Sequence, residues 1–360
     1  MKIGIIGLPT VGKTTLFNLM TGKSAETGTF YGEDREVNQG KAPVPDKRID
    51  KLSELYQPKR TTYAQVEFLD IPGLNPNAGK EANRKFLRHV QDADALVHVV
   101  RAFSDPSIPA INQDIDPVRD LEQIHTELLL ADLTLVETRL ERIKNNKKPR
   151  PEETIEKAVL EKYRAALEKE LPLATVELSD EEREAVYSLA FLTDKPTVIV
   201  VNGGDDAPAT GEFPQKDRLM EYAKAHGSPV VVVSAKIEAE INAMDPEDRE
   251  VFMEEMGIAE SGLVKVTQAA FKSLGLISFF TVGKDEVRAW PIKKGLNARK
   301  GAGKIHSDIE RGFIRAEVVS YSDFIQAGSW EEAQKQGRIR LEPAEYLLQD
   351  GDIVNFRFNV

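Results

Sequence analysis

The chain has 360 residues, a formal net charge of −11 and no cysteine. The length suits two or three domains, and the lack of cysteine excludes disulfides, cysteine-ligated zinc and thiol catalysis. No apolar run is long enough to span a bilayer, and the first residues resemble a strand, so we expect a cytoplasmic protein with no membrane partner. The net acidity argues against nucleic-acid binding by the whole surface and against DNA as a partner, but leaves local basic patches open.

The chain is organised around a glycine-rich loop, Gly7-Leu8-Pro9-Thr10-Val11-Gly12-Lys13-Thr14. Its spacing is that of the phosphate-binding loop of nucleoside triphosphatases, with a strand expected before it and a helix after it. That order disfavours a chance glycine-rich turn. Lys13 would act on the β- and γ-phosphates, and the Thr14 hydroxyl would hold Mg²⁺. The expected nucleotide contacts are Gly7, Pro9, Thr10, Val11, Gly12, Lys13, Thr14 and Thr15.

After the first helix, residues 24–46 are polar and lack periodicity. In a P-loop switch protein such a region covers the γ-phosphate and supplies a threonine to Mg²⁺, for which Thr27 and Thr29 are candidates. A surface loop with no metal ligand is an equally good interpretation. Asp46 is expected to cap a helix at 47–56.

A second buried strand is expected at 66–69, and it ends at Asp70. An aspartate after a buried strand, followed three residues later by a glycine, has the spacing of the Walker-B region. Asp70 would bind Mg²⁺, usually through water, and the Gly73 N–H would contact the γ-phosphate as part of the catalytic site. Leu74 follows, where Ras-like proteins carry a glutamine that orients water, so another group must position the nucleophile or hydrolysis is slow.

Three further buried strands are expected at 95–100, 196–201 and 230–233. The loops after the last two resemble the guanine-reading motifs Asn-Lys-x-Asp and Ser-Ala-Lys. In those motifs the aspartate accepts from guanine N1 and N2, and the alanine N–H donates to O6. A glycine replaces the first lysine here, so the choice of base is left open. The expected base contacts are Asn202, Gly203, Asp205, Ser234, Ala235 and Lys236.

Amphipathic helices at 120–143, 152–171 and 180–190, the last capped by Ser179, predict a helical hairpin inserted into the nucleotide-binding domain. Its tip carries six cations and one acid. These cations either contact phosphates or belong to a solvated helix end, and the two interpretations have equal weight. The cations are Arg139, Arg142, Lys144, Lys147, Lys148 and Arg150.

Beyond a helix at 260–274, short β segments separated by glycines predict a small α+β domain. It contains a basic run that includes no acid, made of Lys293, Lys294, Arg299, Lys300 and Lys304. Trp290 and His306 border this run and could stack on bases, which favours RNA slightly over a solvated loop.

The chain resembles the YchF/Obg-like ATPases, which are translation-associated P-loop NTPases. The resemblance is closest at Glu286-Val287-Arg288-Ala289-Trp290 and at Glu310-Arg311-Gly312-Phe313-Ile314-Arg315-Ala316-Glu317. It covers nearly the whole chain through the stretches 7–18, 43–73, 97–102, 117–142, 234–241 and 276–360.

The resemblance implies an α/β P-loop NTPase domain with an inserted helical hairpin and a C-terminal α+β TGS (ubiquitin-like) domain. The expected boundaries are 1–119 with 193–275 for the nucleotide-binding domain, 120–192 for the insert and 276–360 for the TGS domain. It also implies hydrolysis of ATP in preference to GTP, with Mg²⁺, and binding to the ribosome or ribosomal RNA.

Two departures from the family bear on these expectations. Thr10 stands where the family has an asparagine that helps hold potassium in related NTPases, which argues against potassium activation. Asp205 stands where the family has a glutamate, and aspartate is the residue that reads guanine. A guanine-specific GTPase and an RNA-binding module with a degenerate nucleotide site are therefore alternatives, while a metabolic kinase is disfavoured by the base-reading loops.

Overall fold

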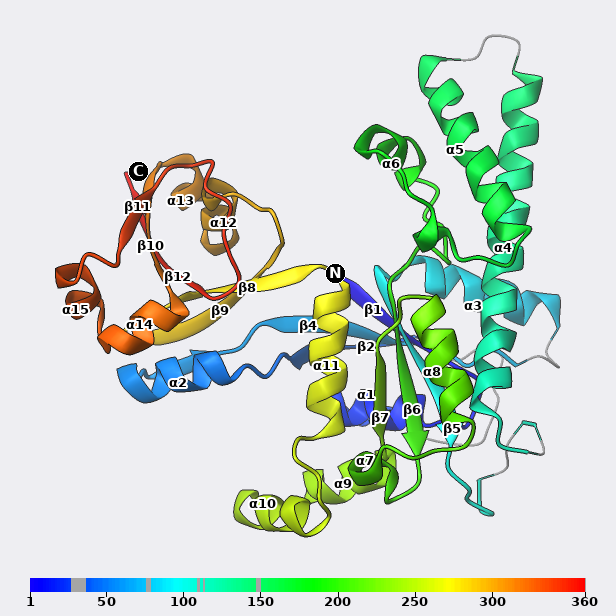
Figure 1. Cartoon of the computed structure of the whole chain (residues 1–360), viewed down its shortest axis with the longest axis horizontal. Helices are drawn as coiled ribbons and strands as arrows, with labels where there is room; N and C mark the ends of the chain where they lie inside the picture. The colour runs from blue at the N-terminus through cyan, green and yellow to red at the C-terminus, as the bar shows by residue number, and fades with distance from the viewer. Residues whose placement is uncertain (27–36, 76–78, 109–110, 113, 147–149, 360) are drawn as a thin grey trace. The chain divides into compact units, whose positions relative to one another are not determined.

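The computed structural model describes residues 1–26, 37–75, 79–108, 111–112, 114–146 and 150–359. The chain forms two compact units, one of residues 1–40 and 67–270 and one of residues 41–66 and 271–360 (Figure 1). This division differs from the expected boundaries at residues 41–66 and 271–275, which were expected in the nucleotide-binding domain, and it does not separate residues 120–192 from the first unit. Among the described residues, no helix is long and apolar enough to cross a membrane.

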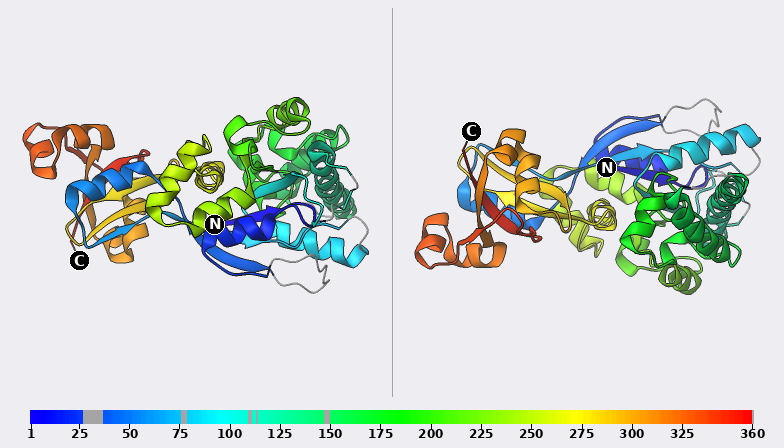
Figure 2. Two further views of the ribbon diagram at one scale, coloured as in Figure 1. Left: turned by 90° about the horizontal axis from the view of Figure 1, so that it is seen from below. Right: turned by 90° about the horizontal axis from the view of Figure 1, so that it is seen from above.

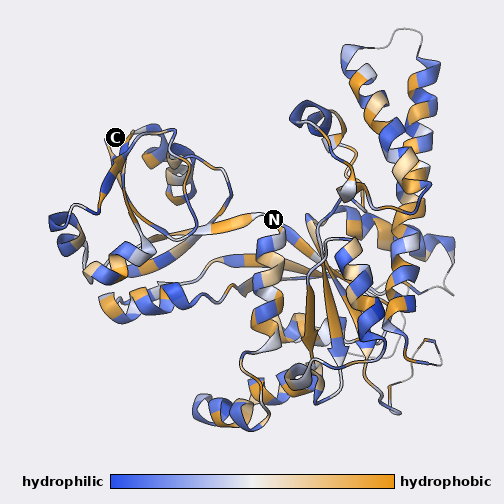
Figure 3. Ribbon diagram, in the orientation of Figure 1, coloured by the Kyte–Doolittle hydropathy of each residue, from blue (hydrophilic) through white to orange (hydrophobic). Residues whose placement is uncertain are grey.

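The first unit is built on a six-stranded sheet in the order β2-β4-β1-β5-β6-β7. Parallel pairing joins β1 to β4 and β5, and joins β6 to β5 and β7, so these strands end at one edge of the sheet. All of β5 is buried, as in a strand covered on both faces, and the inner strands of the sheet are largely hydrophobic (Figure 3). The strands are β1 Lys2–Ile6, β2 Asn38–Pro43, β4 Gln65–Asp70, β5 Ala95–Ala102, β6 Thr197–Gly203 and β7 Val230–Val233.

Helices cover both faces of this sheet (Figure 2). Apolar residues of α4 and α8 pack with β5 and β6 on one face, where α3 also lies, and α1 lies on the other face in contact with α9. The helices of this unit outside the insert are α1 Lys13–Thr21, α3 Lys80–Gln91, α7 Ala207–Thr210, α8 Lys216–Ala225, α9 Ala235–Ala243, α10 Pro246–Glu255 and α11 Gly262–Ser273, the last of which crosses the boundary between the units.

The helical hairpin between β5 and β6 consists of α4 (Pro117–Asn145) and α5 (Pro151–Leu167), followed by η1 (Leu173–Thr175) and α6 (Asp180–Tyr187). α4 begins earlier than expected because the Asp116 side chain accepts hydrogen bonds from two backbone N–H groups of its first turn. α5 ends earlier than expected, and the chain then turns through a positive φ at Glu170. An apolar cluster that includes Val136, Leu160 and Tyr163 holds these helices together.

The second unit contains a mixed six-stranded sheet in the order β11-β10-β12-β8-β9-β3. β12 pairs antiparallel with β10 and in parallel with β8, and α12 packs into the same apolar cluster as these strands. The strands are β3 Arg60–Thr62, β8 Leu276–Thr281, β9 Glu286–Lys293, β10 Phe313–Ser320, β11 Arg340–Glu342 and β12 Asp352–Phe358. The helices are α2 Lys47–Tyr56, α12 Ala298–Ile305, α13 Ser307–Arg311, α14 Tyr321–Ala327 and α15 Trp330–Lys335.

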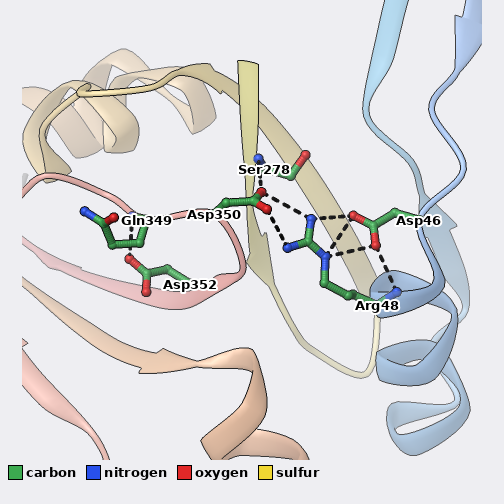
Figure 4. Close-up of polar contacts among 6 residues, drawn as sticks. All are labelled: Asp46, Arg48, Ser278, Gln349, Asp350 and Asp352. Atoms are coloured by element: carbon green, nitrogen blue, oxygen red, sulfur yellow. Dashed lines mark hydrogen bonds and ion pairs between the residues drawn. The ribbon is translucent and has the colours of Figure 1, made fainter. Parts of the chain in front are cut away.

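Arg48 shows why residues 41–66 fold with the C-terminal strands. Its guanidinium donates to Asp46, the residue that caps α2, and to Asp350, with a distance of 2.9 Å from Nη1 to Oδ2. Asp350 also accepts from the Ser278 backbone N–H at 3.0 Å (Figure 4). The pairing of β3 with β9 adds backbone hydrogen bonds to this charged network, so the segment belongs to the second unit although β1 and β4 belong to the first.

Candidate nucleotide-binding site

The loop between β1 and α1 needs both of its glycines. Gly7 and Gly12 have φ angles of +151° and +96°, which residues with a Cβ rarely adopt. A Cβ on Gly7 would lie 2.4 Å from the Val99 carbonyl oxygen, and one on Gly12 would lie 2.4 Å from Asn202 Nδ2. α1 begins directly after Gly12, so the positive end of its dipole lies at the loop, as in anion-binding helix N-termini.

Thr14 and Asp70, the two residues expected at Mg²⁺, lie in contact although 56 positions separate them. Thr14 Oγ1 donates to Asp70 Oδ2 at 2.9 Å, and Asp70 is only 4% exposed. The neighbouring Lys13 is also buried, and its Nζ donates to the Leu8 carbonyl oxygen at 2.7 Å. Lys13, expected at the phosphates, and Thr14 and Asp70, expected at Mg²⁺, therefore lie together where β1, β4 and α1 meet.

This pair of oxygens fits Mg²⁺. Hydroxyl and carboxylate oxygens are hard ligands, and two adjacent ligands at about 2.1 Å in an octahedron lie about 3.0 Å apart, close to the distance between these atoms. In the described part of the chain no group of three or more His, Cys, Asp or Glu could hold a metal. A cation here would take further ligands from phosphates and water, as Mg²⁺ does with nucleotides. Thr27 and Thr29 lie outside the described residues.

Gly73 approaches the phosphate-binding loop more closely than any larger residue could. A Cβ on Gly73 would lie 2.7 Å from the Pro9 nitrogen and 2.8 Å from Lys13 Nζ. Its expected role at the γ-phosphate requires such proximity. Leu74 follows in the wall of the cavity that this loop also lines. It is only 2% exposed, and its side chain can neither donate nor accept a hydrogen bond.

Asn202 joins the phosphate-binding loop to the second base-reading loop. Its Nδ2 donates to the Val11 carbonyl oxygen, and its Oδ1 accepts from the Ala235 N–H, both at 2.9 Å. The Asn202 side chain is buried, so these two bonds satisfy groups that water does not reach. The Ala235 N–H, expected at guanine O6, is therefore already bonded within the protein.

The first base-reading loop differs from the guanine-type arrangement in two ways. A Cβ on Gly203 would lie 2.5 Å from Ala207 Cβ, so α7 occupies the space that a larger side chain would need. Asp205 Oδ2 accepts from Lys236 Nζ at 2.6 Å, and both side chains are largely exposed. Asp205 thus has a cationic partner instead of standing as a free carboxylate beside the base.

Most of the expected contacts line one cavity of about 1250 Å³ in the first unit. Gly7 and Val11 do not line it, since Gly7 packs against β5 and the Val11 carbonyl is bonded to Asn202. The expected residues in the cavity wall are Pro9, Thr10, Gly12, Lys13, Thr14, Thr15, Asp70, Gly73, Asn202, Gly203, Asp205, Ser234, Ala235 and Lys236.

Two stretches that we did not single out also line this cavity. One is the loop after β5, and its signal in the sequence was its place at the carboxyl end of a buried parallel strand. The other is one side of α3, whose sequence carries no recognisable motif. Their lining residues are Phe103, Ser104, Asp105, Pro106 and Ile108 in the loop, and Ala82, Asn83, Lys85, Phe86 and His89 in α3.

The basic tip of the hairpin is smaller than its sequence indicates. Arg139 pairs with Glu156, which is only 6% exposed, so this arginine holds α4 to α5 and is removed from the expected phosphate-binding set. Lys147 and Lys148 lie outside the described residues. Arg142, Lys144 and Arg150 are exposed and stay candidates for contacts with phosphates.

The basic run of the second unit is also partly engaged. Lys300 Nζ lies 2.8 Å from Glu310, and Lys293 Nζ donates to the Leu274 carbonyl oxygen at 2.7 Å. Trp290 packs against the apolar cluster on one side, and the Arg288 guanidinium carbon lies 3.9 Å from its ring centroid. The expected stacking of a base on Trp290 would have to displace Arg288. His306 is exposed, and its ring accepts from the Asp308 N–H as a helix cap.

Together the fold and this site define a P-loop nucleoside triphosphatase. A family model described as 50S ribosome-binding GTPase matches residues 2–139, and the model YchF-GTPase_C, described as a protein of unknown function, matches residues 276–359. Relatives more than 40% identical over the full length of the chain show that it belongs to the YchF family.

Relatives of known name match over the full length of the chain. The "Ribosome-binding ATPase YchF" of Bacillus subtilis is 44% identical and covers 100% of both chains. The protein of the same name from Escherichia coli O157:H7 is 42% identical over 100% of this chain and 99% of its own. A solved structure of the Schizosaccharomyces pombe YchF GTPase, 31% identical, has a TM-score of 0.87 and covers 99% of this chain and 97% of its own.

Proposed function

We propose that this chain hydrolyses ATP in preference to GTP and acts as a nucleotide-dependent conformational switch on the ribosome. The observation that carries the hydrolytic part is the meeting of Lys13, Thr14 and Asp70 at the end of the phosphate-binding loop. The names of its bacterial relatives, ribosome-binding ATPases, support the choice of nucleotide and of partner.

In this proposal the chain stabilises the phosphoryl group by position and charge. Lys13 and the loop N–H groups would stabilise the negative charge on the transferring phosphoryl. Mg²⁺, held by Thr14 and by Asp70 directly or through water, would supply neutralisation of the phosphate oxygens. Because Leu74 cannot orient water, another group must do so, and we expect turnover to be slow until a partner supplies or positions that group.

Two contacts favour adenine over guanine. Guanine O6 would need a hydrogen bond from the Ala235 N–H, but this group already donates to Asn202 Oδ1. Guanine N1 and N2 would need the Asp205 carboxylate, but this group already pairs with Lys236. Adenine requires neither contact. A guanine-specific GTPase is the second candidate, because Asp205 is the guanine-type residue and the S. pombe relative is named a GTPase.

Titration of ATP and GTP into the wild-type chain and into Asp205→Ala separates the two candidates. We expect the wild type to bind ATP more tightly and Asp205→Ala to change that ratio little. A wild-type preference for GTP of tenfold or more, about 1.4 kcal/mol, that Asp205→Ala abolishes would establish the GTPase instead.

The ribosome is the proposed partner, with a cytoplasmic location as the consequence. We infer that the second unit is the TGS domain and that exposed cations of the hairpin tip add contacts to RNA phosphates. Phosphate release measured with and without ribosomes tests this part. Stimulation by ribosomes supports it, and equal rates with and without them argue for an enzyme that acts alone.

A further inference from the structure

Arg101 is a buried arginine at the carboxyl end of β5, only 5% exposed. Its backbone pairs with that of Asn202 on the neighbouring strand, so it lies beside the residue that joins the two nucleotide-binding loops. Its side chain turns to the loop that follows β5. Nε donates to the Phe103 carbonyl oxygen at 3.2 Å, and Nη2 donates to the Ile108 carbonyl oxygen at 2.8 Å.

The hydrogen bonds of Arg101 are important because its guanidinium is buried. A guanidinium taken out of water is costly unless hydrogen bonds replace its hydration. Here backbone carbonyls of one irregular loop supply acceptors, and Nη2 also lies 3.5 Å from the Asp105 carbonyl oxygen. The guanidinium carbon lies 4.3 Å from the centroid of the Phe103 ring, within the range of a cation–π contact. The loop carbonyls therefore stabilise the buried charge of Arg101, and the guanidinium in turn holds the loop in its conformation.

This loop forms a wall of the nucleotide cavity through Phe103, Asp105, Pro106 and Ile108. Hydrogen bonds from Ser107 are the main cause of a lowered pKa at Asp105, and the charge of Lys236 contributes to it. Ala102, the last residue of β5, pairs with Gly203, so this loop begins beside the first base-reading loop. The phosphate side is built by other elements, namely the loop before α1 and the end of β4.

We propose that Arg101 is a positioning residue for the base side of the nucleotide site. By bonding to the carbonyls of Phe103 and Ile108, it holds the loop after β5 as a wall against which the nucleoside packs. The inference rests on the proposed nucleotide function and goes beyond it by separating nucleoside affinity from phosphate affinity and turnover.

The test compares ATP with inorganic tripolyphosphate, which has the phosphates and lacks the nucleoside. Arg101→Met keeps much of the side-chain volume and removes every donor, and Arg101→Lys keeps one charged donor. In Arg101→Met the Kd for ATP should rise about tenfold or more, whereas the Kd for tripolyphosphate and the kcat at saturating ATP should stay within about threefold of wild type. Arg101→Lys should recover part of the ATP affinity.

Arg164→Met is the matched control, because Arg164 is an exposed arginine of the same unit that pairs with Glu168 on its own helix, α5. It should leave both affinities unchanged. Unchanged ATP affinity in Arg101→Met, or equal losses for ATP and tripolyphosphate, would overturn the inference, the second because the damage would be general. Retained tripolyphosphate binding reports a folded phosphate loop. A wild type that binds tripolyphosphate but neither nucleotide would instead refute the proposed function.

Discussion

Replacing Asn202 by alanine tests whether its two side-chain bonds join the loops as described. The change removes the donor to the Val11 carbonyl and the acceptor for the Ala235 N–H. Both bonds are buried, and each contributes a net 0.5–1.5 kcal/mol or so, with a further penalty for the backbone group left unpaired. We expect Asn202→Ala to destabilise the first unit by about 2–4 kcal/mol.

Amide hydrogen exchange measures this loss in each unit separately. Exchange in peptides from β1 and β6 should become faster by the equivalent of that free energy, while exchange in β10 and β12 of the second unit should not change. Asn242→Ala, an exposed change on α9, should stay within about 0.5 kcal/mol of wild type. A loss below about 1 kcal/mol in Asn202→Ala, or an equal loss in both units, would refute the reasoning.

Three further predictions follow from the same structure. Burial and the nearby His226 lower the pKa of His125 to about 4, so the free energy of unfolding should fall as the pH is lowered from about 6.5 towards 4. In urea unfolding, His125→Gln should reduce this pH dependence by up to about 1.4 kcal/mol per pH unit, and an unchanged pH dependence would contradict the prediction. Leu74→Ala should lower stability by about 2–4 kcal/mol but change ATP turnover modestly, and a collapse of turnover would give Leu74 a direct role. Replacing the exposed tip residues Arg142, Lys144 and Arg150 by alanine should make ribosome association less dependent on salt. The slope of log association constant against log salt concentration should fall by up to about 0.9 per lost phosphate contact, and an unchanged slope would mean that the tip is only a solvated helix end.

The phosphate side of the site could be predicted from the sequence because its chemistry fixes residue types at fixed spacings. The loop from Gly7 to Thr14 needs its glycines for backbone shape, and Asp70 is recognisable by its position after a buried strand. Their contact across 56 positions follows from the parallel pairing of β1 with β4. The strands β1, β4, β5, β6 and β7 and the helical hairpin were predictable for a similar reason, since their hydrophobic pattern is local, whereas β2 lies in the polar stretch 24–46 that was expected to be a loop.

Features that depend on distant partners could not be predicted in this way. β3 has three residues and no periodicity of its own, and it becomes a strand only by pairing with β9, more than two hundred positions away. Arg139 looked like a surface cation because Glu156, its partner, lies on another helix. The sequence likewise did not indicate that Asp205 would pair with Lys236, because that contact depends on how two loops meet at the end of the sheet.

The most direct measurement of the central claim is phosphate release from ATP by the wild type and by Lys13→Ala. Lys224→Ala, which removes an exposed lysine of the same unit, serves as the control. The account predicts that Lys13→Ala lowers kcat by about 100-fold or more and weakens ATP binding, because the loop loses the cation that faces the β- and γ-phosphates, while Lys224→Ala behaves as the wild type. Turnover in Lys13→Ala close to that of the wild type would contradict the assignment of this loop as the catalytic nucleotide site.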